Sequence, residues 1–253
     1  MNNEQLLRQW KKEEEDFQLK GWDFSYLDGR MSSPNPPWDY KTIINSYLKS
    51  SDILLDMGTG GGEVLLTIGH PHKNTYITEA YEPNFELCKS KLSPLGITVK
   101  QTFCDDKLPF ENEFFDFIIN RHESFGLSEV SRVLKRGGYF FTQQVINRNC
   151  FELAQILNGK VELDIPNHCI EKYIEALEQI GFQVIIKDEV EVPVKFFDMD
   201  AVIFYAKAIP WEIPSFSVET HFEKLLKIQR MIEADGFFQA TSGRFLLAAR
   251  KLG

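Results

Sequence analysis

A short run, Asp56 to Gly62, places a carboxylate and alternate glycines directly after an apolar segment. The apolar residues 53–55 predict a buried strand, and residues 63–69 can form the helix that follows the glycines. Glycine has no Cβ, so the main chain of such a turn can approach a bound molecule closely. The pattern therefore predicts a strand, a glycine turn and a helix that together hold a ligand against the backbone.

The spacing of the glycines separates two classes of ligand. Asp56, Gly58, Gly60 and Gly62 spell DxGxGxG. Turns of this kind bind dinucleotides or S-adenosylmethionine, and the dinucleotide pattern GxGxxG needs its third glycine where Glu63 stands. A plain tight connection between strand and helix would also use glycines. The missing third glycine favours S-adenosylmethionine over a nicotinamide cofactor.

Further acids follow at the ends of the next predicted strands. Glu79 ends the apolar run 75–79 and is placed to accept hydrogen bonds from the two hydroxyls of a ribose, with Glu82 as the alternative. Asp105 or Asp106, after the third strand, could accept a hydrogen bond from the exocyclic amine of an adenine. These acids predict a site for an adenosyl group along the ends of the strands.

The elements that must position these residues alternate along the chain, which predicts a parallel sheet with helices on both faces. The strand-like runs are residues 52–56, 75–79, 98–103, 115–120 and 138–145. Two helical runs, residues 83–96 and 128–138, are each expected to end at a glycine. One more helix, residues 170–181, is followed by a strand, and a final strand over residues 244–250 closes the core.

From about Ile53 to Val145 the order and spacing of these motifs resemble the class I S-adenosylmethionine-dependent methyltransferases. The resemblance rests on DxGxGxG, an acid ending the second strand, an acid before "LPF", then "FDFII" and "RVLKRGGYFF". It departs from the family pattern in two places: the loop before "LPF" is one residue short, and Glu79 stands for the commoner aspartate. The resemblance implies a Rossmann-like, seven-stranded, mostly parallel sheet whose last strand is antiparallel.

The same resemblance implies roles for individual residues around S-adenosyl-L-methionine, whose product would be S-adenosyl-L-homocysteine. Asp56 would support the methionine amino end. Gly58, Thr59, Gly60 and Gly62 would form the turn that lines the methionine and the ribose. Glu79 would hold the ribose, Asp105 or Asp106 the adenine, and the strand end from Asn120 to Ser124 would border the methyl group.

Transfer of a methyl group from a sulfonium is an in-line displacement, so much of the catalysis can be positioning of the acceptor atom. A base is needed only for a protonated acceptor. His122 could serve as that base, with Glu123 to orient it, but a histidine that only caps the loop is an equal alternative. Arg121 could bind an acidic substrate or the cofactor carboxylate, or form a surface ion pair.

The chain outside the core is expected to select the acceptor. We expect an N-terminal helical and aromatic cap (1–50), the cofactor-binding core (51–190), an inserted lid (191–242) and the last core strand (243–253) within a single domain. In the insertion, Ser217 is a predicted N-cap of a helix. Candidate substrate contacts are the aromatic residues of the cap and the insertion, with Arg30; they include Trp22, Tyr26 and Trp211. Their aromatic character suits a partly apolar small molecule, although packing of a lid would also account for them.

The composition of the chain limits the classes of binding partner that we expect. The chain has 253 residues and a formal net charge of -9, which disfavours a large nucleic-acid surface. Four separated cysteines and five histidines show no metal-ligand spacing, and no run is long and apolar enough to span a membrane. We therefore expect a cytoplasmic enzyme with a small-molecule acceptor, no metal and no membrane partner. The alternatives are an RNA or protein methyltransferase and a non-catalytic adenosyl-binding module.

Overall fold

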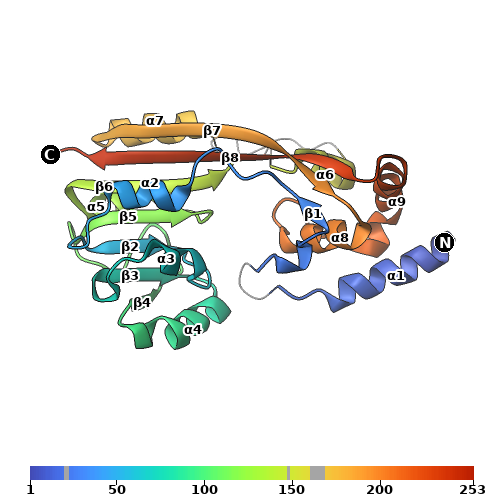
Figure 1. Ribbon diagram of the computed structural model, residues 1–253, viewed down its shortest axis with the longest axis horizontal. Helices are drawn as coiled ribbons and strands as arrows, with labels where there is room; N and C mark the ends of the chain where they lie inside the picture. The colour runs from blue at the N-terminus through green and yellow to red at the C-terminus, as the bar shows by residue number, and fades with distance from the viewer. Residues whose placement is uncertain (20–22, 147–148, 160–168) are drawn as a thin grey trace. The chain divides into compact units, whose positions relative to one another are not determined.

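The computed structural model describes residues 1–19, 23–146, 149–159 and 169–253 (Figure 1). Trp22, one of the predicted substrate contacts, lies outside the described residues. The chain divides into two compact units. The core unit comprises Pro36–Ile146, Asn167–Val190 and Arg244–Gly253. The accessory unit comprises Met1–Asn35, Asn147–Pro166 and Glu191–Gly243.

The core unit is built on a twisted α/β sheet, as predicted. Its strands are β2 (Leu54–Met57), β3 (Thr75–Glu79), β4 (Thr98–Gln101), β5 (Phe115–Arg121) and β6 (Leu134–Val145), together with β7 (Phe182–Phe196) and β8 (Phe238–Lys251), which also extend into the accessory unit. They lie in the order β7-β8-β6-β5-β2-β3-β4 (Figure 1). The pairs of β2 with β3 and β5, of β3 with β4 and of β5 with β6 are parallel, whereas β8 runs antiparallel to β6. The predicted fold, including the antiparallel last strand, is confirmed.

An eighth strand, which the sequence did not predict, joins this sheet. It is β1 (Met31–Ser32), in the accessory unit, and it pairs antiparallel with Lys195 and Phe196 at the far end of β7. Two residues within a turn-rich, polar stretch carry no alternating apolar pattern, so the pairing alone defines this strand.

Helices cover both faces of the core sheet. One face carries α2 (Tyr40–Tyr47), α3 (Glu63–Ile68) and α4 (Glu82–Lys91), and the other carries α5 (Leu127–Val133) and α7 (Ile170–Gln179). Short 3-10 turns at His72–Asn74 and Ser93–Leu95 connect the elements. Successive strand residues alternate between the two hydrophobic layers: Leu54 packs with α2 and α3, while Leu55 packs with α5 and α7. Burial on both faces explains the nearly continuous apolar strands of the sequence.

Two predicted helix ends need correction. The helix expected over residues 128–138 ends at Val133, because Leu134 already pairs with Phe115 and begins β6. The helix expected over residues 83–96 ends at Lys91 and is followed by a 3-10 turn that closes at Gly96, in the left-handed conformation. Gly96 lies in the connection that follows α4, whereas Gly137 and Gly138 lie within β6.

The accessory unit has its own hydrophobic core. Its helices are α1 (Asn3–Asp16), the 3-10 turn Ser25–Leu27, α6 (Phe151–Asn158), α8 (Met199–Ala208) and α9 (Val218–Asp235). Trp10 of α1 is 1% exposed and its ring centroid lies 5.5 Å from that of Phe222 in α9. As predicted, Ser217 caps α9, since its side chain accepts a hydrogen bond from the backbone N–H of Thr220. No helix among the described residues has the length and apolar character that crossing a membrane requires.

Candidate active site

The glycine turn follows β2 and leads into α3. Gly58, Gly60 and Gly62 all have positive φ, between 64° and 77°, where residues with a Cβ are strained. A side chain at position 58 is also excluded by lack of space, since a Cβ there would lie 2.2 Å from Cγ of Glu123. The three glycines are therefore needed for the turn itself, and Gly58 is needed also for the close approach of the Glu123 side chain.

Asp56, at the end of β2, is buried at the base of this turn. Its Oδ2 accepts a hydrogen bond of 2.6 Å from the hydroxyl of Thr59. Burial raises the pKa of Asp56 to about 7, the hydrogen bond from Thr59 opposes this shift, and the negative charge of Glu79 adds to it. The positive charge of Arg121 lowers the pKa of Asp56. Asp56 is therefore a carboxyl group that a nearby positive charge would ionise.

Glu79, at the end of β3, links the glycine turn to the start of α4. The side chain is 4% exposed, and its Oε2 accepts a hydrogen bond of 2.8 Å from the backbone N–H of Gly60. Its Oε1 accepts from the backbone N–H groups of Ala80 and Tyr81, each at 3.1 Å. Burial raises the pKa of Glu79, and the backbone donors oppose the shift. A carboxylate has about four acceptor positions, so Glu79 keeps capacity for a further donor.

The end of β5 is fixed by a buried polar network. The Oδ1 of Asn120 accepts from the hydroxyl of Thr142 at 3.0 Å and from Nε2 of Gln144 at 2.5 Å. Gln144 also donates to the backbone carbonyl of Glu123, and the hydroxyl of Tyr40 donates to the carbonyl of Asn120 at 2.9 Å. These contacts set the direction in which the chain leaves β5 for the residues that follow.

Glu123 is the group that these contacts place against the glycine turn. Burial raises its pKa to about 7, and the negative charges of Glu79 and Asp105 add to the shift. The hydroxyl of Ser124 donates to Oδ2 of Asp105 at 2.5 Å, which brings the acid after β4 to the same strand end. Asp56, Glu79, Asp105 and Glu123 thus influence one another electrostatically around a single turn.

His122 lies between Arg121 and Glu123 and has a positive φ of 62°. Its backbone N–H donates to the carbonyl of Gln143 at 2.9 Å, and its Nε2 lies 3.2 Å from Nε2 of Gln143. Loss of hydration among the surrounding protein atoms lowers the pKa of His122 well below its usual value, and the charges of Arg121 and Arg244 lower it further. His122 is therefore neutral at pH 7.

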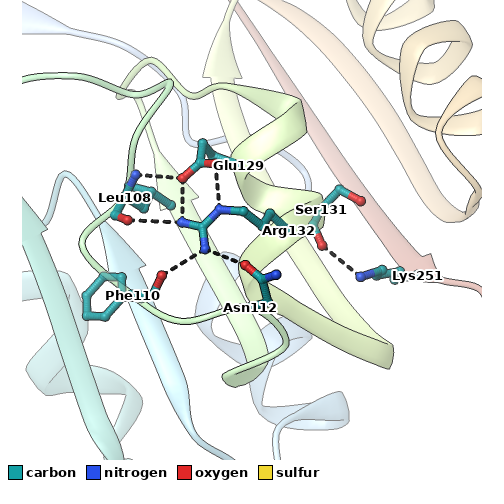
Figure 2. Close-up of polar contacts among 7 residues, drawn as sticks. All are labelled: Leu108, Phe110, Asn112, Glu129, Ser131, Arg132 and Lys251. Atoms are coloured by element: carbon teal, nitrogen blue, oxygen red, sulfur yellow. Dashed lines mark hydrogen bonds and ion pairs between the residues drawn. The ribbon is translucent and has the colours of Figure 1, made fainter.

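The loop that carries the two candidate adenine acids is pinned at its far end by Arg132 (Figure 2). This guanidinium donates to the carbonyls of Leu108 and Phe110 and to the side chain of Asn112, at 2.8 to 3.0 Å. It also forms a two-pronged ion pair with Glu129, whose Oε2 accepts from the backbone N–H of Leu108 at 2.7 Å. The "LPF" segment is thus tied to α5 by charge-assisted hydrogen bonds.

At its near end the same loop approaches the start of α5. A Cβ at Gly126 would lie 2.7 Å from the carbonyl oxygen of Asp105 and 2.9 Å from Oδ1 of Asp106, so a glycine permits the contact. Asp105 is half-buried and turned toward Ser124, whereas Asp106 is exposed. The contact of Asp105 or Asp106 with an adenine stays a prediction.

The predicted substrate contacts divide between the units. Arg121 belongs to the core unit and its side chain is exposed. Tyr26, Arg30 and Trp211 belong to the accessory unit. There Tyr26 stacks on Phe204 with ring centroids 4.7 Å apart, and Arg30 pairs with Asp198 and Asp200 at 3.2 and 3.1 Å, while Trp211 is 59% exposed. Tyr26 and Arg30 therefore have structural contacts of their own.

Three residues that shape the site were not predicted from the sequence: Thr142 and Gln144 hold the end of β5, and Gln143 contacts His122. Trp38 and Tyr40 belong to the aromatic residues of the predicted cap, and here Trp38 donates to Gln143 and Tyr40 to the carbonyl of Asn120. One signal was available in the sequence: "TQQ" places three polar residues inside an otherwise apolar strand, and buried polar residues need partners. Among the described residues no cluster of three His, Cys, Asp or Glu side chains is arranged to hold a metal ion.

Comparison with known proteins agrees with this geometry. Residues 55–142 match the family model of the methyltransferase domain. This segment extends from β2 to β6 and includes the glycine turn, Glu79, both candidate adenine acids and the end of β5. Residues 55–142 are therefore similar in sequence to a methyltransferase domain, and the fold is Rossmann-like.

The chain is also similar to individual proteins. An uncharacterized methyltransferase of Anoxybacillus flavithermus is 29% identical over 166 residues, which cover 57% of this chain and 76% of the relative. A candidate methyltransferase from Bacillus halodurans C-125 has a similar structure (TM-score 0.56, 18% identity, 84% of this chain and 98% of the other). A protein of unknown function from Deinococcus radiodurans R1 matches over 98% of both chains (TM-score 0.57, 13% identity). At these identities the two structures show the fold alone.

Proposed function

We propose that this protein transfers a methyl group from S-adenosylmethionine to a small-molecule acceptor. The observation that carries the proposal is the set of four carboxylates, Asp56, Glu79, Asp105 and Glu123, around the glycine turn of a methyltransferase domain. Burial and mutual repulsion hold the pKa of both Asp56 and Glu123 at about 7. Such a site favours a ligand that brings positive charge, and S-adenosylmethionine carries a sulfonium and an ammonium group.

The residues present fit the three parts of this cofactor. Glu79 would accept a hydrogen bond from a ribose hydroxyl at the acceptor position that its three backbone contacts leave. Asp105 or Asp106 would accept from the adenine amine, and Asp56 would face the methionine ammonium. The bound cofactor would supply an electrophilic methyl group with a neutral leaving group. The protein's task is then to hold the acceptor atom in line with the methyl group and to keep water away.

Proton removal from a protonated acceptor would fall to Glu123. Its carboxyl group lies against the glycine turn and has a pKa of about 7, close to the value that suits a base at neutral pH. His122 is less suited to the role predicted for it, because its pKa lies well below the usual value and its Nε2 already faces the Gln143 amide. Arg121, exposed beside these groups, is suited to an acidic group of the acceptor.

A small acceptor is favoured over RNA by the net charge of -9, since a nucleic-acid surface needs a dense set of basic side chains. The exposed aromatic residues Phe197 and Trp211 of the accessory unit suit a partly apolar molecule. The compartment proposed is the cytoplasm.

The first experiment is thermal unfolding of the protein alone and with S-adenosylmethionine, S-adenosylhomocysteine or NADH. A ligand at about one hundred times its Kd should stabilise the folded protein by about 2.7 kcal/mol, which raises Tm by roughly 5 to 10 °C for a chain of this size. A shift with the two adenosyl ligands only supports the proposal. A shift with NADH alone, or none, contradicts it.

A second experiment separates an enzyme from a binding module. The protein is incubated with S-adenosylmethionine and, in separate arms, pools of small metabolites, RNA or protein, and formation of S-adenosylhomocysteine is followed. Turnover in the small-molecule arm alone is expected. Turnover only with RNA or protein would change the substrate class, and binding without turnover in any arm would favour the non-catalytic module.

A further inference from the structure

We propose that Trp38 and Gln143 are positioning residues that hold His122 as a neutral imidazole with its proton on Nδ1, so that His122 meets a ligand as a hydrogen-bond donor. Any role of this N–H in catalysis rests on the proposed methyl transfer. The protonation state of the ring is independent of that proposal, because it follows from contacts inside the core unit.

Three side chains form a chain of contacts that fixes the ring. The indole N–H of Trp38 donates to Oε1 of Gln143 at 2.8 Å, and Nε2 of Gln143 lies 3.2 Å from Nε2 of His122. An indole nitrogen can only donate, so the amide oxygen of Gln143 must face Trp38. The amide nitrogen then faces His122, and since an amide nitrogen also only donates, Nε2 of His122 must accept. An accepting Nε2 carries no proton, which leaves the proton of the neutral ring on Nδ1.

The backbone holds these partners in place. Gln143 is 5% exposed in the middle of the sheet, where it pairs with Arg121 of β5 on one side and Leu246 of β8 on the other. Its carbonyl accepts the backbone N–H of His122, so one residue contacts both the main chain and the ring of His122. The left-handed conformation of His122 fits this double contact, and a non-glycine residue adopts it only where surroundings enforce it.

The charges around the ring favour the same state. Arg121 and Arg244 are positive and disfavour an imidazolium. The negative charge of the neighbouring Glu123 would oppose this effect, but its pKa is raised to about 7, so Glu123 carries less than a full charge at pH 7. Among the described residues Nδ1 of His122 forms no hydrogen bond, so its N–H is the group that remains for a ligand oxygen. Protonation of Nε2 would instead set two donors against each other across 3.2 Å.

The state of the ring can be read directly by nitrogen-15 NMR of protein labelled at histidine, without any ligand. The chain has five histidines, and the His122→Asn variant identifies the signals of His122 by their loss. The chemical shifts of the two ring nitrogens distinguish the Nδ1–H form, the Nε2–H form and the imidazolium. We expect the Nδ1–H form to dominate at pH 7. Dominance of the Nε2–H form or of the imidazolium would overturn the proposal.

Two variants test the positioning role. Trp38→Phe removes the donor that orients the Gln143 amide, so the amide can turn its oxygen to His122 and the Nε2–H form should gain population. Gln143→Leu removes the partner of Nε2 and should have the same effect. Trp211→Phe, in the accessory unit, is the matched control and should leave the His122 signals unchanged. If both test variants keep the wild-type signals, Trp38 and Gln143 do not set the state of the ring.

The outcome is separable from the proposed function. A protein that fails to bind S-adenosylmethionine would refute methyl transfer and leave the NMR result intact. A protein that binds the cofactor but carries its proton on Nε2 of His122 would refute the positioning role alone. If the test variants do not fold, the wild-type spectrum still decides the first half of the proposal.

Discussion

The carboxylates at the glycine turn are poised between two protonation states. Asp56 and Glu123 have pKa values of about 7, against ordinary values of 3.8 and 4.5, and burial is the largest cause for both. The folded protein therefore binds more protons than the unfolded chain between these ordinary values and pH 7. This contribution to stability is present at low pH and is lost as the pH rises through about 7.

A cationic ligand should reverse that preference. Binding of S-adenosylmethionine is expected to lower the pKa of Asp56 and Glu123 and to release protons near pH 6.5, so affinity should increase from pH 6 to pH 7. Titration calorimetry in two buffers with different ionisation enthalpies measures the protons released. The Glu123→Gln variant should release fewer. Affinity that does not change over this pH range would mean that the ligand's charge does not reach these carboxylates.

Glu79 should carry much of the cofactor affinity. Glu79→Ala removes the predicted ribose contacts and the partners of three backbone N–H groups, and we expect a loss of roughly 1.5 to 3 kcal/mol in binding, as is typical for hydrogen bonds to a charged group. Glu82→Ala is the control, because Glu82 contacts Gln101 instead. Calorimetric Kd values decide the assignment. A loss confined to Glu82→Ala would move the ribose contact to that residue.

At the scale of single residues, the site residues that could be predicted are those within a short local motif. Contacts between strands could not be predicted. Asp56, the glycines and Glu79 could be found because each stands at a predictable strand end within one short motif. The contact of Gln143 with His122 depends on the register of β5 against β6, and that with Trp38 on how the segment before α2 packs. No spacing in the sequence encodes either of these two contacts, although polar residues within a buried strand, as in "TQQ", need hydrogen-bond partners.

Among the elements, α5 and the loop before β5 are coupled through one arginine. Arg132→Met should lower the free energy of unfolding by about 3 kcal/mol, because Glu129 would be left buried without its partner and three backbone or amide oxygens would lose their donor. Urea unfolding measures the change. The double variant Glu129→Met with Arg132→Met removes the unpaired charge and should be less destabilised than the single variant. Equal losses would show that the ion pair itself contributes little.

Element types were predictable where periodicity is strong, and element ends were not. The strands of the core unit are apolar and β-branched or aromatic, and they were recognised. The end of α5 was placed too late, because residues 134–136 continue a helical pattern in sequence while they lie in β6, whose first residue, Leu134, pairs with Phe115 of β5. Pairing with a neighbouring strand outweighs a local preference of a few tenths of a kcal/mol per residue.

At the scale of the whole chain, the residues proposed to bind the cofactor lie in the core unit, whereas the residues proposed to contact the acceptor divide between the two units. The match to the methyltransferase domain lies within the core unit, whereas Tyr26, Arg30 and Trp211 belong to the accessory unit. Each unit has its own buried cluster, so each can respond to a ligand separately.

Hydrogen exchange should show this division. With S-adenosylmethionine alone we expect slower exchange for peptides over residues 56–62 and 78–82, whose amides surround the glycine turn and Glu79. A peptide over α9 should exchange at its ligand-free rate and serves as the internal control. Mass spectrometry of the digested protein gives both in one experiment. Slowed exchange in α9 and none at the glycine turn would place the cofactor outside the predicted site.

The strand order of the core unit also constrains how the chain is made and folded. β8 lies between β6 and β7, yet on the ribosome it follows both of them and the intervening segment 197–237. Until β8 emerges, β6 and β7 each expose a strand edge with unpaired backbone groups, which is a site for mispairing with other chains. Closure of the sheet must wait for a contact between residues about one hundred apart in sequence, such as Thr142 with Leu247. Folding of the core unit should therefore be completed after synthesis, and chaperones that cover strand edges should raise its yield.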